Sequence, residues 1–368
     1  MEQALSLASL ALGQVSPNPA VGAVVVKNDV VLGQGYTQPA GSDHAEIMAL
    51  RQTGEQARGG VMYVTLEPCC HYGRTPPCSQ AIIIAGIAEV HLAMLDPNPL
   101  VSGRGKEELE REGIKTYVGE HEDEAREINE AYAKFITTGI PFVTAKFAIS
   151  LDGKIATKSG DSRWISGEEA RKQVHNLRHI TDAIMVGVNT VLADDPLLTC
   201  RCCGGRGGTA RKQPLRIVVD SRGRTPPTAR LFSEPGKTLL ALGRSVTLGE
   251  AAAFAQAGAE LLELPSAEGL VDLEKLLRAL GEREITSVLV EGGEILLGSL
   301  FDQGLVDRVI AFIAPIIIGG KEAKTAVGGK GVDKVADSLK LERISVERFG
   351  DDLMVSGYVS AKTRGVKI

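Results

Sequence analysis

The chain has 368 residues, which is enough for two domains that each bury a core of their own. Aromatic residues make up only 4% of it while glycine occurs 42 times, a composition typical of α/β folds with many tight turns. No run of about 18 apolar residues predicts a membrane-spanning helix, and the first residues lack the basic segment of a signal peptide. The six cysteines cluster at 69–78 and 200–203, which argues against a disulfide framework and favours the reducing cytoplasm.

Charge is distributed unevenly between the two halves of the chain. Residues 1–140 contain 18 acidic and 10 basic residues, a net charge of −8, and the remaining residues carry +3, which together give the −5 of the whole chain. Partners of tRNA or single-stranded DNA need a basic surface. The acidic first half therefore predicts a small soluble substrate rather than a nucleic acid.

The first 140 residues predict a five-stranded sheet between helices. Helices are expected at 2–12, 44–51, 78–85 and 103–112, and strands at 21–26, 30–35, 61–66, 89–95 and 114–118. Asp43 is the expected N-cap of the second helix, which places His44 and Glu46 in its first turn. A polar connecting helix over 120–138 ends before Gly139 and Pro141, and we place the domain boundary at residue 140.

His44-Ala45-Glu46, followed by Pro68-Cys69 and later by Cys78, is typical of a catalytic zinc site. Catalytic zinc takes three protein ligands and leaves a fourth position to water, whose pKa falls from about 15.7 to about 7. We interpret His44, Cys69 and Cys78 as the ligands, with both cysteines at helix starts, where the helix dipole favours a thiolate. Glu46 is the expected proton shuttle between this water and the leaving amine.

The residues by themselves leave alternatives open. Zinc nucleobase deaminases space their cysteines as P-C-x-x-C, whereas Cys78 lies nine positions after Cys69. Cys70 is the rival ligand, although adjacent cysteines on a chain that enters a helix point apart. A closed structural site with His71 as the fourth ligand, or a group of buried free thiols, is the plainer interpretation, but neither gives a reason for Glu46.

Beyond Pro141 the sequence predicts a different domain. Strands expected at 142–149, 183–188, 215–220, 238–241, 260–264 and 287–290 alternate with helices at 167–181, 248–257 and 272–281, which favours a mostly parallel sheet. Residues 290–299 predict a strand, a Gly292-Gly293 turn and a helix start, where backbone N–H groups can bind a phosphate. The turn suits a plain tight corner equally well, and it lacks the Rossmann fingerprint.

The first half resembles the riboflavin-pathway pyrimidine deaminases. The resemblance lies in H-A-E at 44–46 and in P-C-C-H-Y-G-R-T-P-P-C at 68–78, whose long insert between the two cysteines is the mark of that family. S-P-N-P-A-V-G-A at 16–23 and D-P-N-P at 96–99 resemble its other signatures. The resemblance implies an α/β/α sandwich over 1–140 of the cytidine and deoxycytidylate deaminase kind, Zn²⁺ as cofactor, and substrate contacts from Asn18 and His71.

The second half, 141–368, resembles the riboflavin-pathway reductase at 146–153, 161–166, 186–199 and the turn that begins at Glu291. This implies a dihydrofolate-reductase-like α/β domain that uses NADPH. By motif, the dinucleotide would contact Ala148, Trp164, Thr190, Asp194, Ser221, Gly293, Glu294, Ile295, Leu296, Leu297, Gly298 and Ser299. By the same resemblance, the ribose phosphate substrate would contact Ser162, Arg178, Leu198, Arg201 and Glu291. The two arginines among them suit a phosphate, because guanidinium groups match its oxygens.

One segment departs from the reductase pattern. Residues 200–208, C-R-C-C-G-G-R-G-G, enlarge the loop after Leu198. Segments rich in glycine and arginine rarely hold ligands in a fixed geometry, so we interpret this stretch as a flexible insertion in preference to a second metal site.

The sequence therefore predicts a cytoplasmic, bifunctional enzyme of riboflavin biosynthesis. It would deaminate 2,5-diamino-6-ribosylamino-4(3H)-pyrimidinone 5′-phosphate and then reduce the ribosyl group to a ribityl phosphate. We expect a homo-oligomer with no nucleic-acid or membrane partner. The alternatives are a zinc deaminase with a non-catalytic nucleotide-binding second domain, and a zinc-stabilised RNA-binding protein, which the acidic first half disfavours.

Overall fold

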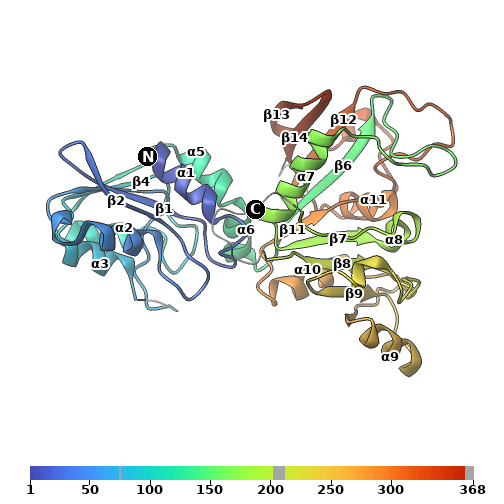
Figure 1. Cartoon of the computed structure of the whole chain (residues 1–368), viewed down its shortest axis with the longest axis horizontal. Helices are drawn as coiled ribbons and strands as arrows, with labels where there is room; N and C mark the ends of the chain where they lie inside the picture. The colour runs from blue at the N-terminus through green and yellow to red at the C-terminus, as the bar shows by residue number, and fades with distance from the viewer. Residues whose placement is uncertain (74–75, 202–211, 361–368) are drawn as a thin grey trace. The chain divides into compact units, whose positions relative to one another are not determined.

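The computed structural model describes residues 1–73, 76–201 and 212–360. The chain divides into two compact units, Met1–Ile140 and Pro141–Ile368, each built around one sheet (Figure 1). Most of the insertion predicted after Leu198 lies outside the described residues, as do Arg74 and Thr75 of the cysteine motif. Within the described ranges, no helix has the length and apolar character needed to cross a bilayer.

The sheet of the first unit has five strands in the order β2-β1-β3-β4-β5. β1 pairs antiparallel with β2 and β3, whereas β3, β4 and β5 are parallel. The predicted five-stranded sheet is thus confirmed, although β3, β4 and β5 are shorter than expected. Its strands are β1 (Gly22–Lys27), β2 (Val30–Tyr36), β3 (Val61–Val64), β4 (Glu89–Leu92) and β5 (Lys115–Val118).

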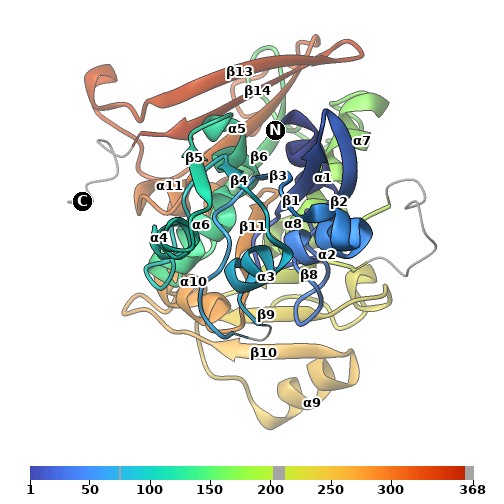
Figure 2. The ribbon, with the colours of Figure 1, turned by 90° about the vertical axis from the view of Figure 1, so that its left-hand side faces the viewer.

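Helices cover both faces of this sheet, with α1 and α5 on one side and α2 and α3 on the other (Figures 1 and 2). Because both faces are covered, consecutive residues such as Val24 and Val25 on β1 are buried alike. The helices are α1 (Glu2–Ala11), α2 (Ala45–Thr53), α3 (Cys78–Ala85), α4 (Arg104–Arg111), α5 (Glu122–Ile128) and α6 (Glu130–Thr138), and the short 3₁₀ helix η1 (Gly54–Ala57) follows α2.

Two details of the predicted helices are wrong. The expected single helix over 120–138 is divided at Asn129, whose carboxamide bonds with the backbone of Ala20. Asp43 does not cap α2: its carboxylate pairs with Arg51, His44 is the N-cap residue, and the helix begins at Ala45.

The sheet of the second unit has nine strands in the order β10-β9-β8-β7-β11-β6-β12-β14-β13. The first seven in this order are parallel, and β14 and β13 add an antiparallel edge, which confirms the mostly parallel sheet. The strands are β6 (Phe142–Ser150), β7 (Ala183–Gly187), β8 (Leu215–Val219), β9 (Thr238–Leu242), β10 (Ala259–Glu263), β11 (Ser287–Val290), β12 (Arg308–Ala314), β13 (Leu341–Phe349) and β14 (Asp352–Val359).

The helices of the second unit follow its parallel strands. Of these, α8 and α11 begin directly after the neighbouring strands β7 and β11, so their N-termini lie at the same edge of the sheet. On β12, Ile310 and Phe312 pack against Ala170 and Val174 of α7. The helices are α7 (Glu168–Ile180), α8 (Val188–Asp194), α9 (Leu248–Gln256), α10 (Leu273–Gly281) and α11 (Glu294–Asp302), with 3₁₀ helices η2 (Arg230–Phe232) and η3 (Val335–Asp337).

Candidate active sites

Four loops of the first unit meet at one edge of its sheet. Because β3 and β4 are parallel, the segments that follow them, 65–78 and 93–103, leave the sheet at the same edge. β1 is antiparallel to β3, so residues 16–21 enter at that edge, and β2 is antiparallel to β1, so residues 37–44 leave there. The predicted zinc residues all belong to these loops or to the helix starts after them.

The structure brings His44, Cys69 and Cys78 together. The Nδ1 atom of His44 lies 3.6 Å from the sulfur of Cys69 and 3.2 Å from that of Cys78. Ligands held about 2.0–2.3 Å from a tetrahedral ion lie about 3.3–3.8 Å apart, close to these two distances. All three ligand atoms lie within 4.8 Å of one another, so small shifts of the side chains would let them hold one zinc. In the described part of the chain, no other histidine, cysteine or acidic residues form such a group.

The two cysteines reach this cluster by different routes. Cys78 is the first residue of α3, as predicted. Cys69 does not begin a helix, so that part of the prediction is wrong: it lies in an irregular segment after β3, and its sulfur accepts the Cys78 N–H at 3.4 Å. Cys70, the rival ligand, is half-exposed and lies outside the cluster.

Hydrogen bonds among the three side chains of the cluster shift their pKa values in different directions. A hydrogen bond from Cys78 lowers the pKa of the Cys69 thiol to about 4, and the same bond together with burial raises the pKa of Cys78. The hydrogen bond with Cys69 raises the pKa of His44 above its ordinary value. A metal ion would have to displace the protons of these groups, because zinc binds thiolates and neutral imidazole.

Glu46 lies in the first turn of α2, two residues after His44, and is only 4% exposed. Burial raises the pKa of its carboxyl group, while the positive charge of His44 lowers it. A buried carboxyl group whose pKa lies closer to neutrality than usual is suited to take up and release a proton. The structure therefore places the predicted shuttle beside the predicted ligands.

Glu67 gave no signal in the sequence, yet its buried carboxylate fastens the loops of this site together. It accepts N–H bonds from Asp96 at 3.1 Å, Gly103 at 2.8 Å and Lys106 at 3.0 Å. The start of α4 is thereby tied to the segment that carries Cys69. Gly105 allows this close approach, since a Cβ there would lie 2.1 Å from the Pro68 carbonyl oxygen.

Asn18 and His71, the predicted substrate contacts, lie in two of the converging loops. Asn18 is half-buried in a turn closed by its own N–H, which donates to the Val15 carbonyl at 2.9 Å. His71 is also half-buried, and its Nδ1 atom is buried with no hydrogen-bond partner among the described residues. Their contact with a substrate stays a prediction.

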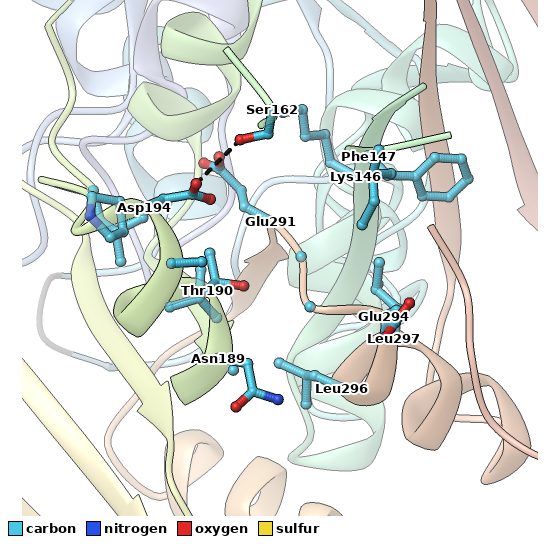
Figure 3. Close-up of a pocket in the computed structure, with 18 of the residues that line it drawn as sticks. Lys146, Phe147, Ser162, Asn189, Thr190, Asp194, Glu291, Glu294, Leu296 and Leu297 are labelled. Carbon is cyan, nitrogen blue, oxygen red and sulfur yellow. Dashed lines mark hydrogen bonds between the residues drawn. The ribbon is translucent and has the colours of Figure 1, made fainter. Parts of the chain in front are cut away.

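The second unit contains a cavity of about 1220 Å³ at the edge where α8 and α11 begin (Figure 3). Every predicted cofactor and substrate residue of this unit lines it except Gly298. Gly298 packs against Gly328 and Gly329 instead, where a Cβ would lie 2.4 Å from their backbone. It supports α11 from behind and does not face the cavity.

A buried ion pair organises one wall of this cavity. Arg178 donates to both carboxylate oxygens of Glu291, at 2.8 Å from Nη2 to Oε2, and to the Thr199 carbonyl at 3.0 Å. Burial alone would raise the pKa of Glu291, but Arg178 lowers it below its usual range. Lys146 of β6, for which the sequence predicted no role, also lines the cavity, and burial lowers its pKa.

Ser162, which also lines the cavity, donates to a carboxylate oxygen of Asp194 at the end of α8 at 3.2 Å (Figure 3). The Gly292-Gly293 turn leads into α11 with φ angles of 128° and 93°, which side chains other than glycine rarely adopt. A Cβ on Gly293 would also lie 3.4 Å from the Thr190 hydroxyl. A glycine turn at a helix N-terminus is suited to the phosphates of a dinucleotide.

Family models match both units of the chain. Residues 1–94 match the cytidine and deoxycytidylate deaminase zinc-binding region, and residues 141–355 match the RibD C-terminal domain. Riboflavin biosynthesis protein RibD of Actinobacillus pleuropneumoniae is 43% identical over 96% of this chain and 93% of its own. Its counterpart in Aquifex aeolicus is 44% identical over 96% of both chains.

Solved structures agree along the same length. Acinetobacter baumannii RibD, form 1, superposes with a TM-score of 0.87 at 37% identity, covering 98% of this chain and 97% of the other. A diaminohydroxyphosphoribosylaminopyrimidine deaminase/5-amino-6-(5-phosphoribosylamino)uracil reductase from Thermotoga maritima gives a TM-score of 0.85 at 34% identity, with coverage of 98% and 97%. The chain therefore belongs to the RibD family of bifunctional riboflavin biosynthesis enzymes, which join a deaminase domain to a reductase domain.

Proposed function

We propose that this chain catalyses two successive reactions of riboflavin biosynthesis. Residues 1–140 deaminate 2,5-diamino-6-ribosylamino-4(3H)-pyrimidinone 5′-phosphate, and residues 141–368 use NADPH to reduce the ribosyl group of the product to ribityl phosphate. The observation that carries the proposal is the cluster of His44, Cys69 and Cys78 beside a buried Glu46. Similarity to the Thermotoga maritima protein, which is named for deaminase and reductase activities on phosphoribosylamino compounds of this kind, supports the choice of substrate.

In the deamination, each residue of the cluster has a distinct task. A zinc ion held by His44, Cys69 and Cys78 would lower the pKa of a water molecule to about 7, which supplies hydroxide at neutral pH. Glu46 takes up the proton of this water and passes protons to the pyrimidine ring and to the departing amine, which leaves as ammonia. Asn18 and His71 hold the pyrimidine in the loops around the cluster.

In the reduction, the cavity of about 1220 Å³ holds the dinucleotide and the ribose phosphate together. The turn at Gly292-Gly293 would bind the pyrophosphate at the N-terminus of α11, and bound NADPH would supply hydride to C1′ of the ribosyl group, whose C1′–O4′ bond opens as O4′ takes up a proton. Arg178 and Arg201 attract the substrate phosphate, with Glu291 fixing Arg178. The remaining contacts come from Ser162 and Leu198 to the substrate, and from Ala148, Trp164, Thr190, Asp194, Ser221, Glu294, Ile295, Leu296, Leu297 and Ser299 to the cofactor.

The turn after β8 favours NADPH over NADH. A carboxylate at such a strand end can bind the ribose 2′-hydroxyl of NADH, whereas arginine accommodates the 2′-phosphate of NADPH. Here Asp220 is fully buried, and its Oδ2 atom accepts the N–H and hydroxyl of Thr225, both at 2.7 Å. Ser221, Arg222 and Arg224 line the cavity in its place.

These arginines are available to an anion. Arg224 donates to the carboxamide oxygen of Asn189 at 2.8 Å, a neutral partner. Among residues 1–73, 76–201 and 212–360, no carboxylate lies within 4.0 Å of a guanidinium nitrogen of Arg222 or Arg224.

We also propose that the chain works in the cytoplasm, because its four described cysteines are free thiols. A homo-oligomer that binds neither nucleic acid nor membrane stays a prediction.

The assignment of ligands predicts which cysteine variants retain zinc. Cys78→Ser should lose the metal, because a thiolate of the cluster is gone, while Cys70→Ser should keep one zinc per chain. In the wild type, apparent zinc affinity should fall as pH falls, by about tenfold per pH unit for each proton displaced, because the raised pKa values of His44 and Cys78 keep those groups protonated. Chelator competition at several pH values measures both effects. Zinc loss in Cys70→Ser with retention in Cys78→Ser would refute the assignment.

Glu46→Gln separates proton transfer from metal binding. The amide keeps the size of the side chain but cannot accept the proton, so ammonia release should fall about 10²- to 10⁴-fold while zinc content stays at one per chain. NADPH oxidation should continue when the deaminated product is supplied directly, because that reaction belongs to the second unit. Unimpaired ammonia release would remove Glu46 from the mechanism. Absence of NADPH oxidation in the wild type would leave the second domain as a non-catalytic nucleotide-binding module.

Arg224→Ala tests the preference for NADPH. Loss of one charged hydrogen bond to the 2′-phosphate should weaken binding of NADP⁺ about 10- to 100-fold and leave binding of NAD⁺ unchanged. The single tryptophan of the chain, Trp164, lines the same cavity, so its fluorescence can follow the titrations. Arg283→Ala is the matched control, because Arg283 pairs with Glu260 and does not line the cavity. Equal losses for both dinucleotides would contradict the assignment.

A further inference from the structure

Two loops beside the zinc cluster are not held in place by the metal ligands. The match to the cytidine and deoxycytidylate deaminase zinc-binding region ends at residue 94, yet the loop 93–103 continues at the edge of the sheet where the cluster lies. This loop and the loop 16–21 contain no zinc ligand. Both are bonded to residues at the start of α6, Asn129 before the helix and Tyr132 within it, which lie beyond the matched region.

Asn129 immediately precedes α6 and is 1% exposed. Its carboxamide bonds with the backbone of Ala20 at both ends: Oδ1 accepts the Ala20 N–H at 2.9 Å, and Nδ2 donates to the Ala20 carbonyl at 3.0 Å. Ala20 follows Asn18 and Pro19 in the chain, so this pair of bonds fixes the segment that carries the predicted pyrimidine contact. Asn129 is also the residue at which α5 ends and before which α6 begins.

Tyr132 lies three residues further on, on the same side of the helical turn, and is 8% exposed. Its hydroxyl donates to the carboxylate of Asp96, at 3.0 Å from Oδ1 and 3.3 Å from Oδ2. The Oδ1 atom of Asp96 also accepts the N–H of Asn98 at 2.8 Å, which closes a turn. Tyr132 therefore fixes the D-P-N-P segment at 96–99.

This second contact leads back to the cluster. The N–H of Asp96 donates to Glu67 at 3.1 Å, two residues before Cys69. Burial raises the pKa of Asp96 to about 6, and the negative charges of Glu67 and Cys69 add to this rise. Burial and the charge of Asp96 raise the pKa of Tyr132, so its hydroxyl remains a donor at any working pH.

We propose that Asn129 and Tyr132 are positioning residues for the deamination: from the start of α6 they hold the loops 16–21 and 96–99, which complete the substrate pocket beside the zinc cluster. The inference rests on the proposed deaminase function. The zinc ligands come from other loops, so loss of either side-chain contact should loosen the fit of the substrate and leave the metal in place.

Two conservative variants of the full chain test this inference. Tyr132→Phe keeps the buried ring and removes only the hydroxyl. Asn129→Asp keeps the acceptor for the Ala20 N–H and turns the donor into an acceptor that faces the Ala20 carbonyl. Tyr117→Phe is the matched control, because Tyr117 is an exposed tyrosine of β5 whose hydroxyl has no hydrogen-bond partner among the described residues.

The measurements are steady-state ammonia release from the diaminopyrimidinone ribosyl phosphate, zinc content per chain and Tm. Both variants should raise KM about 10- to 100-fold with kcat reduced by less, because contacts that position the substrate act in the ground state and the transition state alike. Zinc content should stay at one per chain, and the control should match the wild type in every measurement.

The outcomes separate the inference from the function on which it rests. If the wild type releases ammonia and both variants keep its KM, the positioning role is refuted and the deaminase function stands. A fall in zinc content parallel to the fall in activity also refutes it, since the two residues would then serve the metal site. If the wild type with one zinc per chain releases no ammonia, the proposed function fails and the inference fails with it.

Discussion

The deamination site depends on the pairing of four strands in the first unit. β3 and β4 are parallel, β1 is antiparallel to β3, and β2 is antiparallel to β1, so the chain must enter β1 and leave β2, β3 and β4 at a single edge. Hydrogen bonds between strands thus bring residues 18, 44, 69 and 96 to one place, although they are far apart in the sequence. Glu67 then fixes these loops relative to one another. Its buried carboxylate accepts three N–H bonds, from the loop 93–103 and from the first turn of α4.

In the second unit, too, the pairing of strands brings the residues of the candidate site to one edge of the sheet. α8 and α11 begin after adjacent parallel strands, and open sheets of this kind bind ligands outside the carboxyl ends of their strands. Glycine at 292 and 293 permits a turn that other side chains rarely adopt, and the ion pair of Arg178 with Glu291 fixes an arginine on the cavity wall. Each unit therefore places its chemistry on loops while its sheet supplies the rigid frame.

The residues that carry chemistry were easier to identify from the sequence than those that hold them in place. His44, Cys69 and Cys78 were identified because metal ligands are restricted to a few residue types, and Cys78 was preferred to Cys70 because adjacent cysteines on a chain that enters a helix point apart. Asn129 gave no comparable signal. A polar residue in a charged helix is expected to face solvent, and the residue that Asn129 bonds, Ala20, lies 109 positions away in the sequence. Gly298 was expected to contact the cofactor, but it packs against Gly328 and Gly329. A motif match alone does not tell which side of α11 faces the cavity. Strands β12, β13 and β14 were not among the predicted strands. β13 gives little signal because nearly all its residues are exposed, with charges at 342, 343, 347 and 348 interrupting the apolar alternation.

The proposed deamination requires one zinc ion held by one imidazole and two thiolates, with its fourth position open to water. Zinc X-ray absorption spectroscopy on the purified chain measures this coordination, since sulfur and lighter ligands scatter differently. We expect two sulfur neighbours at about 2.3 Å and two nitrogen or oxygen neighbours at about 2.0–2.1 Å. A shell of three or four sulfurs, or one without sulfur, would contradict this assignment.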